Sequence, residues 1–281
     1  MNTTFASKLD RCPEKLSEAQ LGQYHKDGWL AFGEVLSAGE VEKAREAISE
    51  LIGSAGRDPG ARAWRADKFW IQFEPSYTPD EGEPIAALEL KVRKIAGFHK
   101  SHPHFEYLAL SHPRIQGVVS SILGAGPILF QDMALIKPPF IGSEKPWHQD
   151  DAYFSFVPLG QILGCWIALD DATIENGCMH VLRGGHHLGP KKHHHTFDCE
   201  IEGGRVDVSK AEPVEIPAGG GMFFHGLLPH QTPPNASADR RRALQFHYRG
   251  AETRALPREE YDAVFAEADG TPASCSAVPR K

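Results

Sequence analysis

Apolar residues recur at helical spacing near the start of the chain. After Ser37 they stand at the positions that place one apolar stripe on a helix, namely Val41, Ala44, Ala47, Ile48, Leu51 and Ile52. Ser37 is a good N-cap for this helix and Gly53 a stop signal. An earlier helix is predicted to begin after Ser17 and to end at Gly28, followed by a short strand within residues 29–36.

The patterns change along the rest of the chain. Residues 54–85 are rich in Gly, Pro, Asp and Arg, which predicts a long loop with one strand near Phe69–Phe73. Residues 86–125 are predicted to be helical, up to the glycines and proline at their end. From about residue 127, short apolar or alternating runs are separated by Pro and Gly turns, which is typical of a β-sandwich or barrel.

These elements predict an α+β protein with a mainly β core. The sequence contains no obvious linker, internal repeat or low-complexity tract, so we expect one domain over residues 1–281. Within it, residues 1–125 are expected to form a mainly helical support, residues 126–255 the β core, and residues 256–281 a C-terminal extension.

Composition narrows the classes of function. A hydrophobic content of 41%, a charged content of 24% and a net charge of −7 are ordinary for a soluble protein and give no reason to expect nucleic acid or an anionic membrane as partner. No apolar run approaches the roughly 20 residues that span a bilayer, and the N-terminus lacks the apolar segment of a secretory signal. We therefore expect a cytoplasmic protein, of an oligomeric state that the sequence does not predict.

The cysteines give no sign of a metal site. There are five of them, scattered and without a CxxC spacing, which argues against a zinc–thiolate site or a disulfide framework and favours free thiols.

His148 and Asp150 are the first candidates for chemistry. On an extended strand, residues two apart point to the same side, so this imidazole and this carboxylate can meet one metal ion. A second triplet of this kind, His25 to Asp27, lies in a predicted helix, where residues two apart diverge by about 200°. The first pair is therefore the better metal candidate.

A second histidine must complete such a site, and His225 and His230 follow on a short apolar stretch. Two histidines and one carboxylate on one face of an octahedron leave three positions open, which is the arrangement of non-haem Fe(II) oxygenases. Three arginines at residues 240–242 then begin a predicted strand, on which Arg241 faces opposite to its neighbours. An inward arginine can bind a carboxylate with two N–H groups, and a solvated row of arginines is the alternative interpretation.

With His148, Asp150, His230 and Arg241 in this order, the sequence resembles the phytanoyl-CoA dioxygenase family of Fe(II)/2-oxoglutarate-dependent oxygenases. The resemblance covers most of the chain and includes the segments LIKPP, WHQDDAYF, ILGCWIALDDATIENGCMHVLRGGHH and HGLLPHQTPPNASADRRRAL. It implies a double-stranded β-helix, a jelly-roll or cupin-like core with N-terminal helices packed on it. It also implies a metal site in the mouth of that core.

The resemblance further implies roles for individual residues. His148, Asp150 and His230 match the iron ligands, and Arg241 matches the residue that pairs with the distal carboxylate of 2-oxoglutarate. Other cosubstrate positions are matched by Thr232, Trp166, Met133 and Lys94. Lys91 or Arg93 could take the place of Lys94. For Gln131, two residues before Met133, both a cosubstrate contact and a plain inward polar role stay open.

The implied activity is a dioxygenase reaction that uses Fe(II), 2-oxoglutarate and O₂ on a small-molecule metabolite, with ascorbate as an aid in vitro. Hydroxylation of an unactivated C–H bond, with release of succinate and CO₂, is expected, because Asp150 occupies the position that is vacant in related halogenases. Desaturation, ring closure or epimerisation of a natural-product intermediate stays open. So do a cupin-like metal protein that does not use 2-oxoglutarate and a binding module without catalysis.

The histidines between His186 and His195 lie among Gly, Pro and Lys, which predicts a loop. Adjacent histidines in an extended chain do not generally converge on one ion. A role at the mouth of the site, with Lys191 and Lys192 contacting an anionic group, is the preferred interpretation of this loop.

Overall fold

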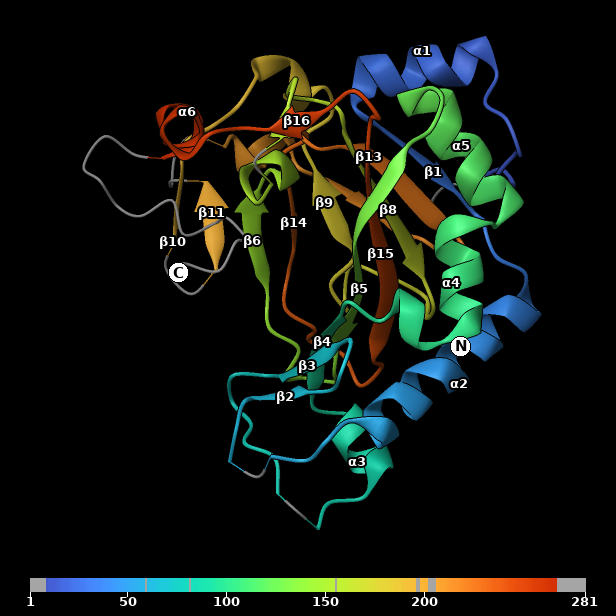
Figure 1. Cartoon of the computed structure of the whole chain (residues 1–281), viewed down its shortest axis with the longest axis vertical. Helices are drawn as coiled ribbons and strands as arrows, with labels where there is room; N and C mark the ends of the chain where they lie inside the picture. The colour runs from blue at the N-terminus through green and yellow to red at the C-terminus, as the bar shows by residue number, and fades with distance from the viewer. Residues whose placement is uncertain are drawn as a thin grey trace.

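The computed structural model describes residues 9–58, 60–80, 82–154, 156–195, 198–201 and 206–266. Its largest element is an antiparallel eight-stranded sheet (Figure 1). From one edge to the other, the strands are β1 (Trp29–Phe32), β13 (Gly221–His225), β8 (Ile162–Ala168), β15 (Arg241–Arg249), β5 (Ile128–Lys137), β4 (Val92–Ala96), β3 (Trp70–Phe73) and β2 (Ala63–Arg65).

A smaller antiparallel sheet of four strands faces the large one. Its order is β12 (Glu212–Val214), β9 (Met179–Val181), β14 (His230–Thr232) and β6 (Lys145–His148). Two strand pairs lie beside it, β10 (His193–His195) with β11 (Cys199–Ile201), and β7 (Phe156–Val157) with β16 (Arg254–Ala255). The two facing sheets make the predicted double-stranded β-helix.

The helices are mostly N-terminal, and most of these gather on one side of the large sheet, whereas the C-terminal helix lies on the opposite side of the molecule (Figure 1). They are α1 (Glu18–Asp27), α2 (Ala38–Ser54), α3 (Ile85–Glu89), α4 (Pro103–Leu110), α5 (Pro113–Leu123) and α6 (Arg258–Phe265), with 3₁₀ turns η1 (His99–Ser101), η2 (Asp150–Ala152), η3 (Gly185–Leu188) and η4 (Val208–Lys210). Ser17 and Ser37 form capping boxes on α1 and α2, as predicted, and Gly28 ends α1 at a φ of 84°. Gly53 does not stop α2, which continues to Ser54.

Alternation along the strands divides the large sheet between two apolar cores. On β8, Cys165 and Ile167 belong to the core that includes residues of α2, α4 and α5, whereas Trp166 and Ala168 belong to the core shared with the four-stranded sheet. The second core is the interior of the β-helix. Side chains of that parity on β5, β8 and β15 therefore point toward the space between the sheets.

The secondary structure differs from the prediction in the first 125 residues. Residues 92–96 were expected in a helix and form β4, which pairs with β5, and β2 adds a second strand to the predicted loop. A short apolar run is ambiguous between helix and strand, and its strand partner lies far away in the sequence. The expected helical support thus also supplies β1 to β4 to the large sheet.

The structure bears on two expectations from composition, those about membrane-spanning segments and about cysteines. In the described ranges, no helix is both long enough and apolar enough to span a bilayer. Cys12, Cys165 and Cys178 are buried free thiols, but Cys199 is disulfide-bonded, so the expectation of free cysteines is wrong at that residue.

Candidate metal centre and cavity

Three predicted ligands meet between the two sheets. His148 is the last residue of β6 and His230 the first of β14, and the two are paired across these strands. The strand ends before Asp150, which opens η2, but Gln149 between them keeps an extended backbone with φ −118° and ψ 134°. The same-face rule for residues two apart therefore still brings the His148 and Asp150 side chains together.

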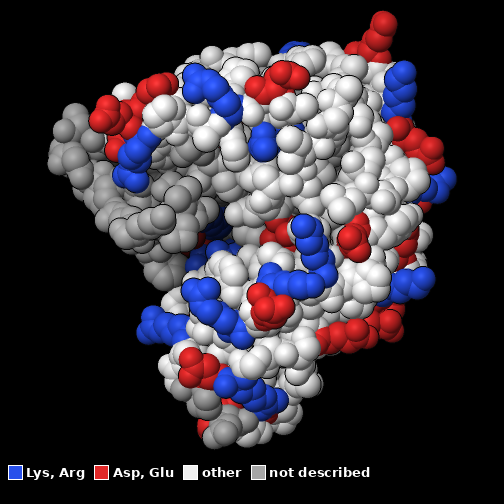
Figure 2. Space-filling view, in the orientation of Figure 1, with Lys and Arg blue, Asp and Glu red and all other residues white. Residues whose placement is uncertain are grey.

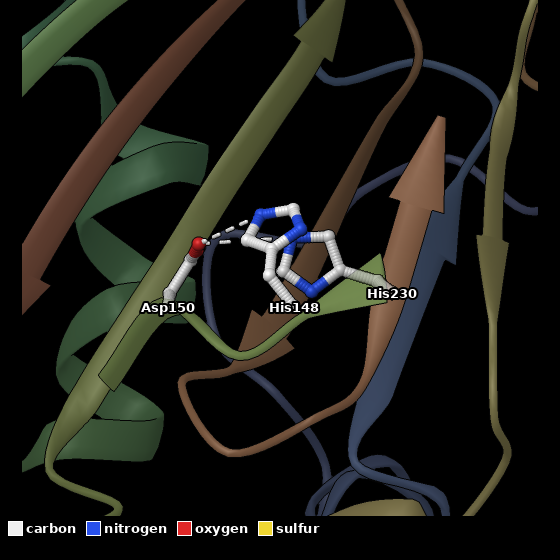
Figure 3. A group of neighbouring side chains, drawn as sticks. All are labelled: His148, Asp150 and His230. Carbon is white, nitrogen blue, oxygen red and sulfur yellow. Dashed lines mark ion pairs between the residues drawn. The ribbon is translucent and has the colours of Figure 1, made fainter. Parts of the chain in front are cut away.

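The ligand atoms of these residues converge (Figure 3). Nε2 of His148 lies 3.5 Å from Oδ1 of Asp150, and Nε2 of His230 lies 3.7 Å from the same oxygen. The three possible ligand atoms all lie within 4.8 Å of one another, and all three residues are buried. Two imidazoles and one carboxylate form a facial donor set suited to a divalent metal with open positions.

Hydrogen bonds fix which nitrogen of each histidine faces the metal position. Nδ1 of His148 lies 2.7 Å from the Pro146 carbonyl oxygen, and Nδ1 of His230 lies 2.9 Å from that of Leu228. A carbonyl only accepts, so each Nδ1 carries the hydrogen and each Nε2 keeps its lone pair. Burial, followed by the neighbouring His148, lowers the pKa of His230 to about 3, so its ring is neutral at pH 7.

Asp150 is the ionised member of the group. Burial alone would raise the pKa of its carboxyl, but the nearby His247 and His230 outweigh it and hold the pKa well below the usual value. Oδ1 faces the two ligand histidines, and Oδ2 lies 2.8 Å from Nε2 of His247 and 3.4 Å from the amide of Gln245. The sequence analysis missed both residues, although they share the strand parity of Arg241.

Hydrogen bonds hold Gln149, the residue between His148 and Asp150. The Gln149 N–H donates to Nε2 of His193 at 3.0 Å, and Nδ1 of His193 bonds the Lys191 carbonyl oxygen. The Gln149 amide donates to the carbonyls of Gly189 and Leu227, which ties the loop before β10 to the segment before β14. His193 therefore supports the metal-ligand segment.

The three candidate metal ligands lie in a cavity of about 540 Å³. All predicted cosubstrate residues line it: Lys94, Gln131, Met133, Trp166, Thr232 and Arg241. The structure thus brings these residues together, from β4, β5, β8, β14 and β15. Arg93 and Lys145 also line it, and Figure 2 shows Lys and Arg side chains at a hollow on one face of the molecule.

The three arginines separate as strand alternation predicts. Arg240 pairs with Glu89 at 3.0 Å, and Arg242 pairs with Asp170 at 2.7 Å. Arg241 turns inward, with 2% of its surface exposed, and its guanidinium lies 5.4 Å from the centre of the Trp166 ring. The alternative of a solvated row of arginines is therefore wrong for Arg241.

Arg241 is also poorly satisfied. Its Nε and Nη1, and Nε1 of Trp166, have no hydrogen-bond partner in the described part of the protein. Burial lowers the pKa of Arg241 to about 10, which leaves it charged at pH 7. Lys137, next to Arg241 across the sheet, is a further buried basic residue of the cavity that the sequence analysis missed, and its Nζ donates to the carbonyls of Ser143 and Thr232.

The sequence left three basic residues as candidates for one cosubstrate position, namely Lys91, Arg93 and Lys94. Lys94 lies in the cavity with its Nζ 4.8 Å from the centre of the Trp70 ring. Arg93 also lines the cavity and contacts Asp198 at 3.2 Å. Lys91 instead lies over Tyr77 and is not among the lining residues. Lys94 is consequently the best placed of the three.

Two histidines of the predicted loop contact the backbone of a helix. His186 and His187 contact the carbonyl oxygens of His25 and Lys26, at the end of α1. Lys191 and Lys192 do not line the cavity, and Nζ of Lys192 donates to the Ala263 carbonyl, so the expected anion contact is not supported.

The chain is similar to known proteins over most of its length. The model of the family "Phytanoyl-CoA dioxygenase (PhyH)" matches residues 24–243. The chain is 28% identical over 269 residues to phytanoyl-CoA dioxygenase domain-containing protein 1 of Danio rerio, covering 84% of this chain and 91% of the relative. It is 29% identical over 262 residues to methylphosphonate hydroxylase of Gimesia maris, covering 91% and 90%.

Solved structures agree on the fold. EvdO2 from Micromonospora carbonacea, complexed with 2-oxoglutarate, superposes with a TM-score of 0.66 at 24% identity, covering 90% of this chain and 98% of EvdO2. The epimerase SnoN, in complex with Fe³⁺ and α-ketoglutarate, gives a TM-score of 0.64 at 22% identity, covering 85% and 86%. At these identities the likeness shows the fold alone.

Proposed function

Because the chain belongs to the phytanoyl-CoA dioxygenase family, we propose that it is an Fe(II)- and 2-oxoglutarate-dependent dioxygenase that hydroxylates an unactivated C–H bond of a small-molecule metabolite. His148, Asp150 and His230 would hold Fe(II) through Nε2, Oδ1 and Nε2. Arg241 would bind the distal carboxylate of 2-oxoglutarate. When bound, the metal would activate O₂, and oxidative decarboxylation of the keto acid to succinate and CO₂ would supply two of the four electrons that reduce O₂, the other two coming from the substrate C–H bond.

The unsatisfied guanidinium of Arg241 is the observation that carries this proposal. Buried N–H groups are nearly always hydrogen-bonded, because leaving one unpaired costs roughly 1–3 kcal/mol. Arg241 keeps Nε and Nη1 without partners, inside the same cavity as the metal ligands. A carboxylate that enters this cavity satisfies two guanidinium N–H groups at once, as a bidentate pair. A metal protein that did not use a dicarboxylate would gain nothing from such an arginine.

The order of residues on the large sheet supports one orientation of the proposed cosubstrate. Along β15, inward positions run from Arg241 through Ala243 and Gln245 to His247, and the last two contact the metal ligand Asp150. Leu135 pairs with Ala243, and Lys94 stands beside Leu135 on the next strand. Met133 and Trp166 stand beside Gln245. Met133, Trp166 and Lys94 thus lie between the metal ligands and Arg241. We place the cosubstrate there.

The substrate would then occupy the other end of the cavity, near His247. Aromatic residues line it near His247, where the Phe130 and Phe154 rings meet edge to face with centroids 4.7 Å apart. Tyr153 lies 5.6 Å from His148, between ring centroids. These walls suit an apolar portion of a small substrate and exclude water from the reacting carbon. Gln131 lines the same part of the cavity and keeps its amide oxygen unpaired.

The protein itself orients the two histidine rings and shields the carboxylate contact from solvent. The Nδ1 bonds of His148 and His230 fix both rings with their lone pairs facing the metal position. The Trp166 ring under the guanidinium shields the carboxylate contact from solvent, which strengthens it.

The test is succinate formation from 2-oxoglutarate under O₂, with Fe(II) and ascorbate, across a library of small metabolites. The matched control is His148→Ala, which removes one ligand. We expect succinate from the wild type and none above background from the variant. A product that gains one oxygen atom from O₂ identifies hydroxylation, whereas an unchanged oxygen count points to desaturation, ring closure or epimerisation. Wild-type protein that makes no succinate, coupled or uncoupled, would contradict the proposal.

A further inference from the structure

His247 contacts the metal ligand Asp150 from the large sheet. Nε2 of His247 lies 2.8 Å from Oδ2 of Asp150, whereas Oδ1 of the same carboxylate faces Nε2 of His148 at 3.5 Å. The two oxygens therefore have different partners. Oδ1 faces the position of the metal, and Oδ2 faces β15.

The chemistry of the pair sets the direction of the hydrogen bond. An ionised carboxylate only accepts, so the hydrogen is on Nε2 of His247 and the histidine donates. The Gln245 amide lies 2.8 Å from the same Nε2. A flip of this amide presents its oxygen to the N–H of His247, and the donor to Oδ2 of Asp150 is then His247 and not Gln245.

The surroundings of His247 leave this contact as its main polar interaction. The side chain is 1% exposed, and its ring lies 5.0 Å from that of Phe154 and 6.0 Å from that of Phe130, between centroids. Nδ1 has no hydrogen-bond partner among the described residues. A phenylalanine could fill this apolar site without a buried, unpaired nitrogen, so packing alone does not explain a histidine here.

We propose that His247 is a positioning residue of the metal centre, which holds Oδ2 of Asp150 so that the carboxylate binds the metal through Oδ1 alone. This inference rests on the proposed function. A carboxylate released from His247 can rotate and chelate the metal through both oxygens. It would then take one of the three open positions, two of which the keto acid needs and one of which O₂ needs. The same strand thus fixes both ends of the cosubstrate site, through Arg241 and His247.

The experiment measures the binding of 2-oxoglutarate to Co(II)-loaded protein by calorimetry, together with the visible absorption of Co(II). His247→Phe and His247→Ala remove the N–H donor, with and without filling the space. His247→Gln keeps an N–H at a similar reach. Tyr248→Phe is the control for disturbance of the strand, because Tyr248 is the next residue and faces the opposite core. Thermal melting establishes that each variant is folded.

We expect the Kd of 2-oxoglutarate to rise about tenfold to a hundredfold in His247→Phe and His247→Ala, the range typical of residues that orient metal ligands. Co(II) binding should persist with an altered absorption spectrum. His247→Gln should recover most of the affinity, and Tyr248→Phe should match the wild type. If either donor-free variant folds and binds 2-oxoglutarate within twofold of the wild type, the inference is wrong. It is also wrong if His247→Gln or Tyr248→Phe loses as much affinity as His247→Phe.

The same data separate this inference from the proposed function. Wild-type Co(II) protein that does not bind 2-oxoglutarate would overturn the proposed function, and this inference with it. Wild-type binding with no effect of His247 would overturn the inference alone.

Discussion

Replacing Arg241 by methionine separates cosubstrate binding from stability. Arg241 is a buried cation with two unpaired nitrogens in the protein without ligand. Methionine fills a similar volume and carries no N–H groups. The variant therefore loses the proposed partner of the distal carboxylate and at the same time removes a buried, unsatisfied charge.

The burial and the contacts of Arg241 set the expected size of both effects, on cosubstrate binding and on stability. Removing one partner from a buried, hydrogen-bonded charge pair costs about 2–5 kcal/mol of binding free energy. Since 1.36 kcal/mol corresponds to a factor of ten, the KM for 2-oxoglutarate should rise roughly 30-fold to 5,000-fold. Each unpaired buried N–H group costs about 1–3 kcal/mol in the ligand-free protein. The free energy of unfolding of the Arg241→Met apoprotein should consequently stay equal to that of the wild type or rise.

The assay is succinate formation at varied 2-oxoglutarate, combined with urea unfolding of the apoprotein. Arg242→Met is the matched control, because this neighbouring arginine faces the opposite side and pairs with Asp170 at 2.7 Å. Breaking a buried pair by removing one partner costs about 3–5 kcal/mol of stability, and Arg45, which lies 3.2 Å from the same carboxylate, offsets part of this cost in Arg242→Met. Arg242→Met should therefore be less stable with an unchanged KM, the opposite pattern from Arg241→Met.

A KM for 2-oxoglutarate that stays within threefold of the wild-type value in Arg241→Met would refute the reasoning. So would an equal rise of KM in Arg242→Met, since the effect would then not depend on the inward face. A large loss of stability in Arg241→Met would show that the guanidinium is already satisfied in the ligand-free protein.

Three further outcomes are expected. Burial lowers the pKa of Lys94 to about 8, so Lys94 loses its charge as pH rises through about 8. If Lys94 binds the cosubstrate, kcat/KM for 2-oxoglutarate falls above that pH, and Lys94→Arg, which stays charged, removes the fall. Mn(II) at a hundredfold excess over its Kd should raise the free energy of unfolding by about 2.7 kcal/mol in the wild type and not in His230→Ala, as thermal melting would show. His193→Leu leaves the Gln149 N–H without its acceptor, so calorimetry should show metal affinity about tenfold weaker.

Alternation was the part of the sequence that predicted the site best. It predicted that Arg241 faces opposite to its two neighbours, and the contacts of Arg240 with Glu89 and of Arg242 with Asp170, together with the burial of Arg241, bear this out. The same rule, continued along the strand, also points Gln245 and His247 inward. The sequence contained the signal for these two residues, but a lone glutamine and a lone histidine carry no motif that singles them out.

Long-range pairing was what the sequence could not provide. Lys94 sits in a short apolar segment that is equally compatible with a helix, and only its pairing with Leu135 on β5 makes it a strand residue that faces the cavity. His193 lies on β10, in a stretch that the sequence predicts to be a loop, and its partner, the Gln149 N–H, is 44 residues away. Such contacts depend on the folded topology and have no local pattern.

The site depends on both sheets, in different ways. Arg241, Gln245 and His247 stand on one strand, so the distance from the arginine to the contacts of Asp150 is set by the regular rise of β15. His148 and His230 come from β6 and β14 of the facing sheet, and their position relative to β15 is set by the core between the sheets. A slip of one residue in the pairing of β15 would turn all three inward side chains outward at once. The central place of β15, paired along its length with β5 and β8, opposes such a slip. The register of β15 therefore fixes the cosubstrate end of the site, and packing between the sheets fixes the metal end.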